Sequence, residues 1–118
     1  MLLAAGIAMG ALGAHALQDL LTLARLASWD TACLYMLVMG AALVGAPAAG
    51  RGQRRALTAV VVGTGLFSGS IVGLVALATL DMGAPFRAVL GPATPLGGVL
   101  MIGGWASWGW QVWASRKR

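Results

Sequence analysis

The chain has 118 residues, of which 59% are hydrophobic and 9% are charged, and its mean hydropathy is +0.86. So few charged side chains would not cover the surface of a globular domain in water, which excludes a soluble fold and favours a bilayer as the solvent. The formal net charge of +5 comes from short clusters at the ends of apolar segments, a pattern typical of membrane orientation and not of nucleic-acid binding.

The first apolar segment predicts a membrane-spanning helix over about residues 1–18. No charged side chain interrupts Met1–Leu17, and Gln18-Asp19 ends the run. The small residues of Ala14-His15-Ala16 would suit a signal-peptide cleavage site, but no Lys or Arg precedes the apolar stretch. We therefore expect the segment to be retained, with a mis-set start of the chain as an alternative reading of its abrupt beginning.

Two further spans are predicted at about 29–46 and 56–80. Pro47 marks the end of the second span because proline lacks the amide donor and disfavours a helical residue before it. No charged side chain lies between Ala56 and Leu80. The third span is therefore the strongest transmembrane signal in the chain, and its length allows some tilt across a hydrocarbon core about 30 Å thick.

The fourth span is predicted at about 95–114. We expect Asp81–Gly91 to form a connector, Thr94 to cap the following helix and Pro95 to occupy its first turn. Together the spans predict an all-α fold, in which residues 1–118 form a single four-helix transmembrane domain.

Positive charge predicts the orientation of these spans. Four crossings put six cationic side chains on the face that holds the second loop and the C-terminus: Arg51, Arg54, Arg55, Arg116, Lys117 and Arg118. The opposite face holds Arg25 and Arg87, so the positive-inside rule predicts that both termini are cytoplasmic in a bacterial inner membrane. The tryptophans predict an aromatic belt at each face, with Trp29 at one and the others at the C-terminal end: Trp105, Trp108, Trp110 and Trp113.

Glycines predict where the helices pack. Gly65, Gly69 and Gly73 repeat every four residues in the third span, and Gly6 and Gly10 make a matching stripe in the first. In lipid, small residues let helix backbones approach closely, so we expect these glycines to lie at helix contacts within the bundle. A homodimer seam or a passage lined by small residues are the alternatives.

His15 is the only histidine, and an ionisable side chain in a membrane segment is a candidate functional group. We expect it to form a hydrogen bond with Asp30 or Tyr35 of the second span; a proton-linked, ligand-binding, metal or haem role is the alternative. The sequence contains no cluster of metal ligands, no paired carboxylates and no activated Ser68 or Ser70. It therefore predicts no catalytic site, no metal site and no cofactor.

Arg87 and Thr94 define the least generic stretch, the connector before the fourth span. We expect a structural turn followed by a helix cap. The alternative is that these residues, with the unpaired amides at the start of that helix, form a corner that favours anions.

Four sequence motifs follow one another with matching spacing: Gly10–Leu17, Trp29–Tyr35, Leu66–Ser70, and Leu90–Gly98 with Gly104-Trp105 downstream. In these motifs the chain resembles the domain of unknown function 423 family, the YgdD-like small proteins of bacterial inner membranes that have mitochondrial relatives in animals. The resemblance covers almost the whole chain and implies a compact four-helix membrane protein without an assigned activity. It departs from the family at Met39, where relatives usually carry a histidine four residues after the tyrosine.

We expect a non-enzymatic accessory, lipid-binding or partner-binding bundle, because packing features are abundant and reactive groups are scarce. Its expected partners are membrane lipid and a second copy or another membrane protein, and no nucleic acid. The alternative is a small oligomeric transporter or channel whose polar path runs near His15, Tyr35, Ser68 and Ser70. A membrane enzyme would need a partner chain to supply the missing catalytic groups.

Overall fold

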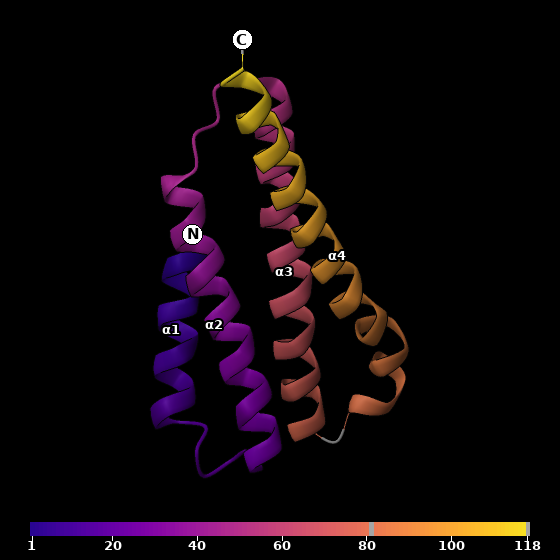
Figure 1. The fold of residues 1–118 in the computed structure, drawn as a ribbon. Coiled ribbons are helices and arrows are strands. Elements are labelled where there is room, and N and C mark those ends of the chain that lie inside the picture. The colour runs from indigo at the N-terminus through magenta and orange to yellow at the C-terminus, as the bar shows by residue number, and fades with distance from the viewer. Residues whose placement is uncertain (81, 118) are drawn as a thin grey trace.

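The computed structural model describes residues 1–80 and 82–117, with the side chains of 83–85 left aside. Within these residues the chain forms four helices (Figure 1): α1 (Leu2–His15), α2 (Leu23–Gly45), α3 (Arg51–Thr79) and α4 (Gly83–Ser115). The predicted all-α membrane fold is confirmed, since α2, α3 and the Phe86–Ser115 part of α4 are long and apolar enough to cross a membrane.

Helix α1 is apolar but shorter than its expected span. Its 14 residues reach about 21 Å, against about 30 Å for the hydrocarbon core. It ends at His15, and the residues from Ala16 to Thr22 form turns instead of extending the helix. Helix α1 begins beside the C-terminal half of α2 and runs antiparallel to it (Figure 1).

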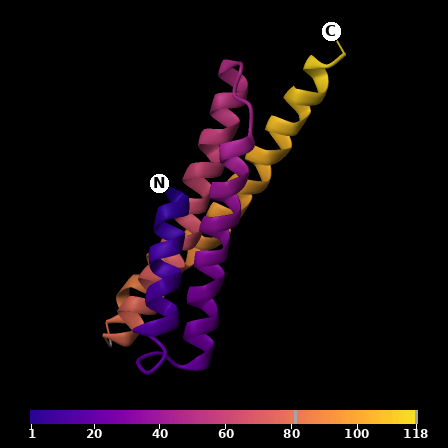
Figure 2. The same ribbon diagram turned by 90° about the vertical axis from the view of Figure 1, so that its left-hand side faces the viewer.

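The helices form a flattened row. α1 packs against α2, α2 against α3, and α3 most extensively against α4. The Cα atoms extend over 56 × 29 × 18 Å, and the second view shows α4 crossing α3 at an angle (Figure 2). Because no helix is surrounded by the others, many large apolar side chains point outwards, among them Ile7, Val44 and Ile102. Such a surface requires lipid around it.

An apolar cluster lies where α2 and α3 meet the end of α1 and the turns that follow it, and its buried members are Leu21, Trp29, Cys33 and Val75. The expectation that Trp29 belongs to an aromatic belt is wrong, because its side chain is only 6% exposed. Gly13 leaves room for the ring, since a Cβ there would lie 2.8 Å from Cδ1 of Trp29. The indole Nε1 donates a hydrogen bond to the carbonyl of Met9 at 2.8 Å, as a buried indole requires.

Three glycines bring α3 and α4 into backbone contact. A Cβ at Gly97 would lie 2.6 Å from the carbonyl oxygen of Gly63 and 2.5 Å from the amide nitrogen of Phe67. A Cβ at Gly104 would lie 2.8 Å from the carbonyl oxygen of Ala56. Only glycine fits at these points, so the closest helix contact depends on Gly63, Gly97 and Gly104.

Most of the glycines that the sequence predicts at helix contacts do not lie at such contacts. A Cβ at Gly65, Gly69 or Gly10 would meet no atom within 4 Å, so the expectation that these three make helix contacts within the chain is wrong. Two positions along a helix rotate a residue by about 200°, which turns Gly65 away from the α4 side that Gly63 faces. Gly6 does lie in a contact, with a Cβ 2.9 Å from Cγ of Leu37.

Gly73 is intermediate, because its Cβ would lie 3.3 Å from Cδ1 of Leu90. Leu90 belongs to α4, so this glycine faces the first turns of that helix. It tolerates less added volume than Gly69 and more than Gly97.

The N-terminal part of α4 differs from the prediction. The helix begins at Gly83 and continues through Pro92 and Pro95, so the expected connector over 81–91 is wrong from Gly83 onwards. Met82 precedes the helix, and Asp81 lies outside the described residues. Proline has a helical φ and costs the helix one amide donor, a loss that helices in membranes tolerate when neighbouring groups compensate. The helix changes direction near its beginning (Figure 1).

Candidate functional site

Two buried serines of α3 join this helix to its neighbours, whereas the buried Thr64 donates to the carbonyl of Val60 within α3. Ser68 is 1% exposed and its Oγ donates to the carbonyl of Ala32 in α2 at 2.9 Å. Ser70 Oγ donates to the carbonyl of Phe67 at 2.9 Å and lies 2.6 Å from Oγ1 of Thr94 in α4. Because Ser70 has one hydroxyl hydrogen, Thr94 is the donor of the second bond. Thr94 therefore links α4 to α3 and does not cap a helix.

The remaining predicted polar residues are separate from these serines. His15 is exposed at the end of α1, and no hydrogen bond joins it to Asp30 or Tyr35 in the part of the chain that the structure describes. The bond expected between them is therefore not formed. The ring of Tyr35 packs against that of Phe67 with centroids 4.5 Å apart, and Asp30 is exposed.

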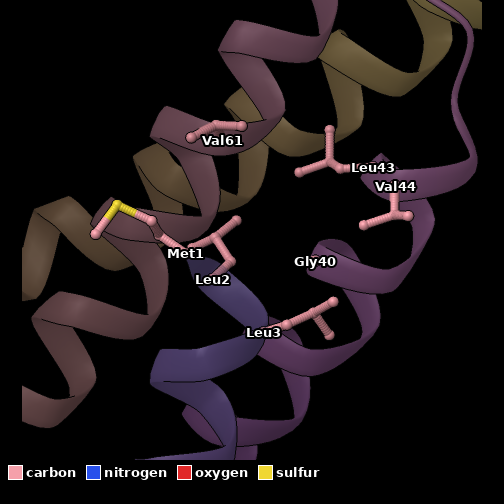
Figure 3. Close-up of a pocket in the computed structure, with 7 residues that line it drawn as sticks. All are labelled: Met1, Leu2, Leu3, Gly40, Leu43, Val44 and Val61. Carbon is pink, nitrogen blue, oxygen red and sulfur yellow. The ribbon is translucent and has the colours of Figure 1, made fainter.

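Two cavities are lined mainly by apolar side chains. The one beside Tyr35 is otherwise lined by Leu34, Val38 and Met39. The other, of about 290 Å³, lies at the beginning of α1 (Figure 3), and its lining is Met1, Leu2, Leu3, Gly40, Leu43, Val44 and Val61. Neither is lined by His15, Ser68 or Ser70.

The tryptophans of α4 hold its C-terminal half to the rest of the chain. Trp105 Nε1 donates to Sδ of Met39 at 3.2 Å, so Met39 serves as an acceptor within the bundle. Trp108 Nε1 donates to the carbonyl of Pro47 at 2.9 Å. Trp110 and Trp113 are exposed, as expected of a belt at this end of the helix.

A different group of polar side chains shares one groove of about 430 Å³ between α2, α3 and α4. Its lining is polar or cationic on α2 and α4 and apolar on α3: Arg25, Ser28, Thr31, Arg87, Ile71, Leu74, Val75 and Ala78. We name it the two-arginine groove. Sequence reasoning selected Arg87 but missed Arg25, which lies far away in the chain.

Local sequence explains how the groove is built. Thr22 caps α2 by accepting from the amide of Arg25 at 3.4 Å, which fixes this arginine in the first turn. The four apolar residues of α3 follow the i, i+3, i+4, i+7 spacing that forms one helix face. That face is the floor of the groove.

Two cationic groups supply the charge of the groove. Ser28 and Thr31 donate to the carbonyls of Ala24 and Ala27 within α2, at 3.1 Å and 2.9 Å. Their hydroxyl hydrogens are therefore used, and the guanidinium groups of Arg25 and Arg87 remain as charged donors. A guanidinium presents five N–H donors that match the geometry of phosphate and carboxylate.

The position of both arginines suits the edge of a bilayer. Arg25 lies in the first turn of α2 and Arg87 near the beginning of α4. Long cationic side chains near the ends of membrane helices reach the headgroup region. The groove thus combines an anion-binding rim with an apolar floor, an arrangement able to hold an amphiphile with a negatively charged head. Among the described residues, no three His, Cys, Asp or Glu side chains could hold a metal ion.

Comparisons with known proteins agree with the membrane fold. A family model described as a protein of unknown function, DUF423, matches residues 9–98. A UPF0382 membrane protein of Schizosaccharomyces pombe is 37% identical over 105 residues, which cover 86% of each chain. No solved structure matches the chain. The family match includes both arginines of the two-arginine groove.

Proposed function

This chain belongs to the DUF423 family, and from that premise we propose that it is a non-enzymatic membrane protein that binds an anionic phospholipid in the two-arginine groove. One observation carries the proposal: Arg25 and Arg87, from two different helices, line the same groove, whose apolar floor is provided by α3. In this pose the phosphate lies between the guanidinium groups and an acyl chain lies along α3.

The expected energies are modest and measurable. A cationic side chain near an anionic membrane surface contributes on the order of 1 kcal/mol to lipid attraction. Since about 1.4 kcal/mol corresponds to a tenfold change in affinity, losing one arginine should weaken binding about five-fold. Losing both should weaken it about 25-fold if the two contributions add.

The contacts of the serines argue against the alternative of a transporter or channel. A polar path would need Ser68 and Ser70 to face water, whereas Ser68 bonds to Ala32 and Ser70 to Thr94. His15 is exposed at the end of α1, whereas both serines belong to α3. These hydroxyl groups act as links between helices, which fits a binding or accessory protein.

We also propose a bacterial inner membrane as the location, with the C-terminus cytoplasmic. The support is the cluster of cationic residues at the beginning of α3 and the end of α4, compared with Arg25 and Arg87 at the other end. A reporter fused to the C-terminus that is active only in the periplasm should be silent. An active reporter would show that the C-terminus is periplasmic and would refute the proposed orientation.

Lipid retention measured by native mass spectrometry tests the binding proposal. The protein is placed in nanodiscs of phosphatidylcholine with increasing phosphatidylglycerol, and the bound lipids are identified after release. We expect preferential retention of phosphatidylglycerol, and Arg25→Gln or Arg87→Gln should weaken the affinity for one bound phosphatidylglycerol about five-fold. Arg116→Gln is the matched control, because Arg116 follows the C-terminal end of α4 and does not line the groove. Equal retention of both lipids, or equal effects of all three substitutions, would refute the proposal.

A further inference from the structure

A second groove runs between α3 and α4 at the end of the structure that carries the C-terminus (Figure 1). It encloses about 530 Å³ and is polar at one end and apolar at the other. Arg55, Ser107 and Gln111 lie at the polar end, and Ala59, Val99 and Gly103 line the apolar part. We name it the Arg55 groove.

Small residues create the Arg55 groove. α3 and α4 touch beside it, where a Cβ at Gly104 would lie 2.8 Å from the carbonyl of Ala56. Next to this contact Ala59 contributes only a methyl group, and a Cβ at Gly103 would meet no atom within 4 Å. The space over Gly103 is therefore open to a molecule from outside.

The length of the groove matches one leaflet. Its lining on α4 extends from Val99 to Gln111, which is about 18 Å at 1.5 Å per residue. Half of a hydrocarbon core about 30 Å thick is about 15 Å. One extended acyl chain of a phospholipid would therefore lie along it from the polar end to the middle of the bilayer.

The polar end has the donors that an anionic headgroup needs. Gln111 Nε2 donates to the carbonyl of Ser107 at 3.2 Å and to its Oγ at 3.1 Å. Since Oγ accepts this bond, the Ser107 hydroxyl hydrogen is directed elsewhere and can join the Arg55 guanidinium on a phosphate. Asp19 and Asp30 lie at the other end of the helices and do not oppose the charge of Arg55.

We infer that the Arg55 groove binds a second anionic phospholipid, with its phosphate at Arg55 and Ser107 and one acyl chain over Ala59 and Gly103. The inference goes beyond the proposed function, because this groove lies between other helix faces and at the opposite end from Arg25 and Arg87. The protein would then bind lipids of both leaflets.

Photocrosslinking tests this site directly. Phosphatidylglycerol with a photoreactive group in one acyl chain is incorporated into phosphatidylcholine nanodiscs, and labelled peptides are mapped after irradiation. We expect labels to concentrate around Ala59 and Val99–Gly103. Arg55→Gln should reduce this labelling about five-fold. Gly103→Leu should abolish it by filling the groove.

Matched controls separate the groove from general lipid contact. Gly98→Leu adds the same side chain at another open glycine of α4 that does not line the groove, and Arg51→Gln removes a cation one turn away from Arg55. Both variants should be labelled like the wild type. The Arg25→Gln, Arg87→Gln double variant should also keep its labels here, so failure of one site does not imply failure of the other.

Three results would overturn the inference. Labels spread evenly around α4 would mean that the groove holds no defined lipid. Equal labelling by a phosphatidylcholine probe would show that the groove does not select a negatively charged headgroup, and so that Arg55 has no role in recognition. Unchanged labelling in Gly103→Leu, with its fold verified by circular dichroism, would exclude the groove as the binding position.

Discussion

Replacing Gly97 with alanine should weaken the contact between α3 and α4. The added Cβ would lie 2.5 Å from the amide nitrogen of Phe67 and 2.6 Å from the carbonyl oxygen of Gly63. Both are backbone atoms, so neither can move as the end of a side chain would, and the helices must separate. Overpacking of this kind costs about 1 to 3 kcal/mol. Alanine's higher helix propensity returns at most about 1 kcal/mol, so the net effect should be destabilising.

The same reasoning predicts no loss at Gly69. A Cβ there meets no atom within 4 Å, so Gly69→Ala should leave the free energy of unfolding unchanged or slightly higher. Even Gly69→Leu should be tolerated, although the four-residue glycine repeat alone predicts an overpacking cost. Gly69→Ala is therefore the matched control for Gly97→Ala, with the same added methyl group in the neighbouring helix.

Equilibrium unfolding in detergent, followed by circular dichroism, compares these variants. The reasoning is refuted if Gly97→Ala is as stable as the wild type. A loss of stability in Gly69→Leu that depends on protein concentration would instead indicate that the open glycine face contacts a second copy of the chain.

Two further substitutions test the polar residues by the same unfolding measurement. Ser68→Ala should cost about 1 kcal/mol because it removes the buried hydrogen bond that Ser68 adds to the carbonyl of Ala32 from a neighbouring helix. The control Ser28→Ala loses an exposed bond within its own helix and should cost less, and equal costs would contradict the role of Ser68 as a link between helices. His15→Ala should change the free energy of unfolding by less than about 0.5 kcal/mol, since the side chain is exposed and makes no hydrogen bond to Asp30 or Tyr35. A larger loss would indicate that His15 does form the contact expected from the sequence.

Some residues of the candidate sites could be identified from the sequence, and others only from the structure. Arg87 could be selected from the sequence because it lies near a helix beginning in an otherwise apolar chain. Its neighbour Arg25 could not, because the two belong to helices that are not consecutive and meet only across α3. The position of Thr94 before Pro95 predicts a helix cap, whereas its hydroxyl group bonds to Ser70.

By itself the sequence determined the class of this protein: an all-helical membrane chain with long spans near those of α2 and α3. The composition of a segment, the length of its uncharged run and the proline that ends it, here Pro47, are local features of the sequence. Solvation of each segment by lipid depends on such local features alone. The tertiary structure decided which glycines touch, that α4 continues through Pro92 and Pro95, and which arginines share a groove. Those outcomes depend on how far each helix is rotated about its axis and on pairs of residues distant in the chain, and no local pattern specifies either.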